Sequence, residues 1–141
     1  MKTLTLDLGT HVGWRFLDGI QIIQSGTLHL ATKEELRMQR QEGKERTLDL
    51  RFARMVAFLQ EKFALGIQRV VFEDVTFSGS PIQNQLWSAL RTAIWVAAPA
   101  ANVAIYCVPV TTLKVYATGK IRADKSQMAQ ALVDAEPSLT N

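Results

Sequence analysis

The chain has 141 residues, of which 48% are hydrophobic and 21% are charged, a size and composition typical of one folded domain and not of a disordered chain. Its net charge of +3 is too small to indicate a nucleic-acid partner by itself, and its single cysteine, Cys107, excludes an internal disulfide and a cysteine-rich zinc site. No apolar run reaches the roughly 20 residues of a membrane span, and Asp7 interrupts any N-terminal signal sequence, so we expect residues 1–141 to form a single cytoplasmic domain.

The first thirty residues predict three strands joined by tight turns. Leucines alternate with polar residues over 2–8, which is the period of a strand. A second predicted strand covers 12–17 and ends at Asp18-Gly19, a hairpin signal, and a third covers 20–30. Sequential strands with such short connections pair as an antiparallel meander.

Beyond residue 30 the pattern alternates between helix and strand. A polar stretch covers 32–46, and an apolar stripe over 48–63 then predicts a helix that stops at Gly66. The other predicted elements are a strand at 69–75, a loop at 76–81, a long helix at 82–101, a strand at 103–110, a short helix capped by Thr111 and Thr112 that ends at Gly119, and a helix from Lys125 that is capped by Asp124 and broken by Pro137. We therefore expect an α/β fold with a five-stranded mixed sheet, a three-strand antiparallel meander plus two parallel strands, flanked by helices.

Acidic residues interrupt two of the apolar strands. Asp7 lies in the first predicted strand, and Glu73 and Asp74 end the fourth. We expect these strands to be neighbours, which would bring the acids together, and clustered carboxylates suit Mg²⁺ or Mn²⁺. The alternative is that each acid meets a lysine or arginine at a strand end. Strand alternation places Glu73 and Asp74 on opposite faces but does not choose between them.

Three motifs together resemble the RuvC-type Holliday-junction resolvases of the ribonuclease H-like superfamily. They are LDLGTHVGW, VVFEDV and VPVTTLKVYATGKIRADKSQMAQAL, and the compact size is similar to the phage-encoded branch. The resemblance implies a metal-dependent endodeoxyribonuclease for branched DNA, with Asp7 and Glu73 as catalytic acids that bind Mg²⁺ (Mn²⁺ as the alternative). It also implies a basic active-site residue at Lys125 and a more peripheral lysine at Lys114, for which the alternative is solvated helix-end charge.

The chain departs from the family in one respect. The family's last acidic pair would fall about twenty residues past Lys125, beyond Asn141, whereas Asp134 and Glu136 lie too early. Either the sequence is a piece of a longer chain or this member lacks the third acid. A catalytically inactive junction-binding protein of the same fold is therefore the second hypothesis. A third, an actin-like ATP-binding domain suggested by the DLGT turn, expects a much longer chain.

The charge distribution favours an anionic partner. Residues 111–125 carry Lys114, Lys120, Arg122 and Lys125 against Asp124, a net +3 that equals the charge of the whole chain. Such a basic segment is typical of contacts with a phosphate backbone, whereas the mixed charges of 33–54 are less polarised. Phe77, in the loop after Glu73, is expected either to stack on a base or to pack on the neighbouring helix.

The long helix at 82–101 is apolar on more than one side, which predicts either a deeply buried helix or a homodimer interface with Arg91 near the twofold axis. The remaining candidate side chains have ordinary interpretations. Cys107 is expected to be an inert core residue. His11, alone at a turn, is a poor indicator of a metal, and His29 alternates with Leu28 and Leu30 as an exposed strand residue.

Overall fold

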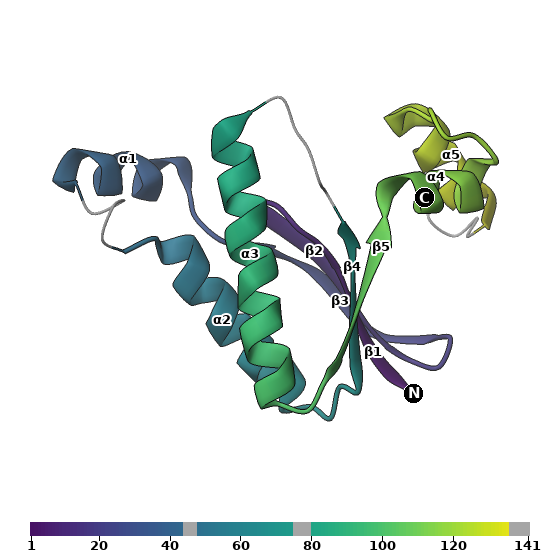
Figure 1. Ribbon diagram of the computed structural model, residues 1–141, viewed down its shortest axis with the longest axis horizontal. Coiled ribbons are helices and arrows are strands. Elements are labelled where there is room, and N and C mark those ends of the chain that lie inside the picture. Colours follow the sequence, from purple (N-terminus) through teal and green to yellow (C-terminus); the bar gives the residue numbers. More distant parts are fainter. Residues whose placement is uncertain (44–47, 75–79, 136–141) are drawn as a thin grey trace. The chain divides into compact units, whose positions relative to one another are not determined.

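The computed structural model describes residues 1–43, 48–74 and 80–135 (Figure 1). The chain divides into two compact units, Met1–Cys107 and Val108–Asn141. Within the described ranges, no helix has the length and apolar character needed to cross a membrane. The elements are β1 (Lys2–Asp7), β2 (His11–Asp18), β3 (Gln21–His29), α1 (Lys33–Glu42), α2 (Leu50–Phe63), β4 (Arg69–Asp74), α3 (Pro81–Ala100), β5 (Ala104–Pro109), α4 (Val110–Thr118) and α5 (Lys125–Ala135).

The five strands form one mixed sheet in the order β3-β2-β1-β4-β5, as predicted. β1 pairs antiparallel with β2, and β2 pairs antiparallel with β3 through a turn in which Gly19 has a positive φ of 60°. β1 pairs in parallel with β4, with Leu6 level with Phe72. The ends of β1 and β4 therefore lie next to each other, which confirms the predicted adjacency of the two acid-bearing strands.

The helices α2 and α3 cover one face of this sheet (Figure 1). Met55 and Leu59 of α2 and Leu90 and Ile94 of α3 are completely buried. They belong to one core with strand residues of a single face, namely Leu4, Leu6, Val12, Phe16, Val70 and Phe72. Because side chains alternate along a strand, the residues between them point to the opposite face.

Trp14 fixes α2 on the meander. Its ring lies 5.7 Å from that of Phe58, and the Lys62 ammonium lies 4.1 Å from the Trp14 centroid. Gly26, the residue opposite Trp14 on β3, leaves room for the indole, because a Cβ at this position would come within 3.0 Å of it. A glycine at this site thus lets the indole lie flat across the neighbouring strand.

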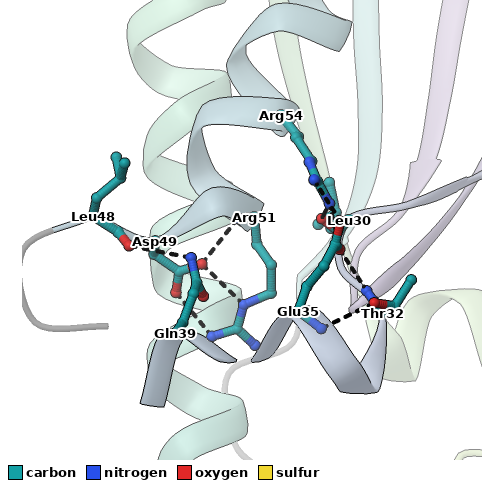
Figure 2. A network of polar contacts seen from close by, with 8 residues as sticks. All are labelled: Leu30, Thr32, Glu35, Gln39, Leu48, Asp49, Arg51 and Arg54. Atoms are coloured by element: carbon teal, nitrogen blue, oxygen red, sulfur yellow. Dashed lines mark hydrogen bonds and ion pairs between the residues drawn. The ribbon is translucent and has the colours of Figure 1, made fainter. Parts of the chain in front are cut away.

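α1 is a helix that the polar pattern of 32–46 did not assign. Thr32 is its N-cap: the Thr32 hydroxyl accepts a hydrogen bond from the Glu35 N–H at 3.1 Å, and the Glu35 carboxylate accepts one from the Thr32 N–H at 2.9 Å. Figure 2 shows that Arg54 of α2 also donates to both Glu35 oxygens, each at 2.8 Å. The signal was present in the sequence, because Thr32 and Glu35 have the spacing of a capping box.

Several predicted helix ends can be compared with the structure. α2 begins at Leu50, behind its cap Asp49, and ends three residues before Gly66. The prediction that Thr111 and Thr112 cap the next helix is wrong, because α4 already begins at Val110, after Pro109, with no side-chain cap. A proline at this position supplies the extended backbone that precedes a helix but no capping oxygen.

The other two signals in the second unit are confirmed. Gly119 ends α4 in the left-handed conformation with φ of 73°. The Asp124 carboxylate accepts a hydrogen bond from the Gln127 N–H at 2.8 Å, which caps α5. Pro137 and Glu136 lie outside the described residues.

Candidate active site

Asp7 and Glu73 lie on one face of the sheet, at the adjacent ends of β1 and β4. Leu6 pairs with Phe72 and both are buried against the helices, so the next residue of each strand points to the opposite face. Asp7 is exposed and Glu73 is half-buried. On the other side of Asp7, its partner on β2 is Gly13, which places no side chain beside the carboxylate.

Asp74 points the other way, toward α3. Its carboxylate accepts a hydrogen bond from Arg91 Nη1 at 3.1 Å, and both side chains are largely buried, with exposed fractions of 27% and 30%. The structure therefore separates the two neighbouring acids: Glu73 shares the face of Asp7, whereas Asp74 follows the alternative interpretation of a strand-end acid that meets an arginine.

Two side chains of α3 contact the strand ends directly behind the candidate acids. Trp87 Nε1 donates to the backbone carbonyl of Leu8, the residue after Asp7, at 2.9 Å. Arg91, one helical turn later, contacts Asp74, the residue after Glu73. Arg91 also lies 4.9 Å from the Trp95 ring centroid. One face of α3 thus anchors both strand ends and sets which side chains point away from the core.

Sequence reasoning missed this role of Arg91, which was considered only for a dimer axis. A usable signal was present, because Arg91 is the one charged residue among the twenty residues of α3. A single charge on a helix that packs against a core indicates a buried partner of opposite sign. Arg91 Nε is buried without a hydrogen-bond partner among the described residues.

Cys107 does not have the predicted position in the core. It is exposed at the end of the edge strand β5, where the apolar core gives way to the Asp74–Arg91 pair. Desolvation by neighbouring groups, together with the Asp74 carboxylate, raises the pKa of the Cys107 thiol above its ordinary value. The neutral thiol is therefore favoured at this position.

Comparisons with known proteins bear on the fold. No protein-family model and no curated protein sequence matches the chain. Thermus thermophilus RuvC, solved in complex with a Holliday junction substrate, matches with a TM-score of 0.70 and 19% identity over 95% of this chain and 78% of that chain. A second structure of Thermus thermophilus RuvC matches with a TM-score of 0.67 and 19% identity over 95% and 79% of the two chains. The chain has the fold of RuvC.

The fold shared with RuvC confirms the predicted ribonuclease H-like architecture, while the identity is low enough that it shows the fold alone. The candidate acids stand at the ends of two central strands of that fold. Asp7 and Glu73 offer oxygen ligands, which Mg²⁺ prefers, and one or two carboxylates suffice for an ion that keeps several waters or binds substrate phosphates. Within 1–43, 48–74 and 80–135, no group of three or more His, Cys, Asp or Glu side chains gathers to hold a metal. The donor set thus fits a magnesium ion held by two carboxylates.

The basic residues singled out in the sequence belong to the second unit. Lys114 lies on α4, Lys120 and Arg122 lie in the segment between α4 and α5, and Lys125 is the first residue of α5. Lys120, Arg122 and Lys125 are exposed, and Lys114 is half-buried. This exposure suits phosphate contacts and solvated surface charge equally. Phe77 lies outside the described residues.

Proposed function

We propose that the chain is a metal-dependent endodeoxyribonuclease that hydrolyses phosphodiester bonds in Holliday junctions or other branched DNA. The observation that carries this proposal is the placement of Asp7 and Glu73 on one sheet face at adjacent strand ends. It is supported by the fold shared with RuvC, whose solved complex contains a Holliday junction, and by the three motifs in the sequence.

In this proposal Asp7 and Glu73 hold Mg²⁺, or Mn²⁺ in its place. The ion supplies an activated water and stabilises the leaving oxygen of the phosphodiester. Asp7, on the central strand, is the bridging ligand, and Glu73 also orients the attacking water. Lys125 donates to the scissile phosphate as negative charge develops there. The role of Lys125 rests on the resemblance in sequence.

The proposed DNA contacts are independent of base sequence. Lys114, Lys120 and Arg122 bind phosphates, and Phe77 stacks on a base near the cleavage point. A homodimer would make two matched cuts, because a four-way junction has approximate twofold symmetry. The exposed large side chains Trp95 and Val96 of α3, with exposed fractions of 50% and 67%, make that helix the proposed dimer surface.

A synthetic four-way junction incubated with Mg²⁺ tests the proposal. We expect symmetric nicks from the unmodified protein and a loss of at least about a hundredfold in cleavage rate for Asp7→Asn and for Glu73→Gln. Junction binding in a gel-shift assay should persist, because these changes remove negative charge beside the DNA. Asp18→Asn is the matched control, since Asp18 lies at the opposite end of β2. Normal cleavage by Asp7→Asn would overturn the assignment.

The second candidate is a junction-binding protein without nuclease activity. It is favoured by the presence of only two carboxylates, and no third metal ligand, in the part of the chain that the structure describes. In the same assay this function gives retention of the junction with no nicks in either Mg²⁺ or Mn²⁺, and Asp7→Asn then has no effect on the products.

A further inference from the structure

The two histidines of the chain, which lie far apart in sequence, form a contact across the meander. His11 opens β2 and His29 closes β3, and the two residues are direct partners in the antiparallel register. Their Nδ1 atoms lie 2.7 Å apart, and their rings meet edge to face with centroids 4.7 Å apart. Both side chains are exposed. Two imidazole nitrogens thus converge on one solvent-facing point.

The strand register explains why the rings come so close. The Leu30 N–H donates to the Thr10 carbonyl at 3.0 Å, so Thr10 and Leu30 are a hydrogen-bonded pair of the ladder. His11 and His29 are then the adjacent non-hydrogen-bonded pair, the position at which opposing side chains of antiparallel strands approach most closely. Backbone pairing therefore holds the imidazoles together before any ligand arrives.

The chemistry of the contact suits a metal ion. Between two imidazoles, one Nδ1 must donate a proton and the other must accept it, so one nitrogen lone pair is already aimed at its neighbour. On a tetrahedral ion with metal–nitrogen bonds of about 2.0–2.1 Å, two nitrogens lie about 3.3 Å apart. A small rotation of the two rings would open the observed 2.7 Å to that spacing and replace the shared proton with the ion.

We propose that His11 and His29 form a bidentate binding site for a late first-row divalent cation such as Zn²⁺ or Cu²⁺, with water completing its coordination. Imidazole nitrogen favours these ions over Mg²⁺, which favours oxygen. The site is distinct from the proposed catalytic carboxylates. It uses β2 and β3 where that pair uses β1 and β4, and it stands or falls independently of the nuclease proposal.

The site has a clear position relative to the carboxylates. Gly13 is the β2 partner of Asp7, and His11 lies two residues before Gly13, so all three share one sheet face. A bound ion would tie the end of β3, an edge strand, to β2 beside the β1–β2 turn. We therefore expect metal binding to stabilise the meander, since a ligand that binds only the folded state raises the free energy of unfolding.

Calorimetric titration of ZnCl₂ into protein without an affinity tag tests the site, because the sequence contains only two histidines and one cysteine. The experiment uses a Cys107→Ser background to remove the thiol ligand. We expect one ion per chain, weaker binding as the pH falls because protons compete for the nitrogens, and no competition from millimolar Mg²⁺. Either His11→Gln or His29→Gln should weaken binding at least about tenfold, since the second bond of a chelate is intramolecular.

Two controls and one spectrum make the outcome decisive. Thr27→Ala, on the same face of β3, and Asp7→Asn should both bind Zn²⁺ as the background protein does. With CuCl₂, electron paramagnetic resonance should show coupling to two imidazole nitrogens in the background protein and to one in either histidine variant. Unchanged Zn²⁺ affinity in the His11→Gln/His29→Gln double variant would overturn the proposal, as would loss of the site in Asp7→Asn.

Discussion

At the scale of single residues, the orientation of the candidate acids depends on contacts made on the other side of the sheet. Trp87 and Arg91 are four residues apart on α3, and each binds the residue that follows a candidate acid. Side chains alternate along a strand, so fixing Leu8 and Asp74 toward α3 points Asp7 and Glu73 away from it. The carboxylate pair is thus positioned by residues that do not touch it.

Arg91→Gln should destabilise the protein by about 2 kcal/mol, because it leaves the largely buried Asp74 carboxylate without its cation. The free energy of unfolding from urea titration measures this loss. Arg37→Gln is the matched control, since Arg37 pairs with Glu34 on the surface of α1, where an ion pair contributes at most about 1 kcal/mol. Equal losses in the two variants would contradict the structural role of Arg91. Asp74→Asn added to Arg91→Gln should recover part of the loss.

At the scale of elements, α1 is attached to α2 by a polar network (Figure 2). Arg54 joins the Glu35 carboxylate to the Leu30 carbonyl, which it contacts at 2.8 Å. Buried Gln39 of α1 donates to the Leu48 carbonyl at 3.3 Å. α1 is otherwise polar, so these contacts, more than burial of an apolar face, fix its place.

The Glu35 contacts make the α1 attachment sensitive to acid. Hydrogen bonds from Arg54, and then from the Thr32 N–H, lower the pKa of Glu35 from 4.5 to about 2. A carboxyl whose folded pKa lies below its unfolded value stabilises the fold above pH 4.5, and this contribution is lost as the pH falls from 4.5 to about 2. Urea midpoints measured at pH 7, 4.5 and 2.5 should therefore fall less steeply for Glu35→Gln than for the unmodified chain.

The control for this experiment is Glu61→Gln, which removes an exposed carboxylate of α2 and should leave the pH profile unchanged. Asp49, whose pKa is lowered by Arg51, contributes an acid-dependent loss of its own in every variant. The decisive quantity is therefore the difference between profiles. Parallel profiles for Glu35→Gln and the unmodified chain would contradict the prediction.

At the scale of the whole molecule, the net charge is concentrated in one segment. Residues 111–125 carry +3 and the chain carries +3, so the rest of the sequence is neutral. If this segment binds phosphates, each lost contact should lower the slope of log affinity against log salt by about 1. Lys120→Gln/Arg122→Gln should therefore weaken junction binding and flatten its salt dependence by up to about two phosphate contacts.

The comparison for this variant is Lys33→Gln/Arg40→Gln, which removes the same charge from exposed positions of α1. Filter binding of the four-way junction between 50 and about 200 mM salt gives both slopes. Identical slopes for the two double variants would show that only total charge matters and would remove the special role of the 111–125 segment.

Local pattern determined most of the architecture of this protein. Alternation of leucines, the Asp18-Gly19 turn and the apolar stripe of α2 are short-range signals, and they were enough to predict the strands, the meander and the adjacency of β1 and β4. They also placed Asp7 at a strand end. Such signals work because burial of one face imposes a period of two on strands and 3.6 on helices.

Only the tertiary structure decided which side chains meet. The choice between Glu73 and Asp74 needed the β1–β4 register and the position of Arg91 on α3. The contact between His11 and His29 needed the β2–β3 register, in which residues 18 positions apart become direct partners. Register is set by long-range pairing, and a shift of one residue would turn each side chain to the other face, so no local pattern contains this information.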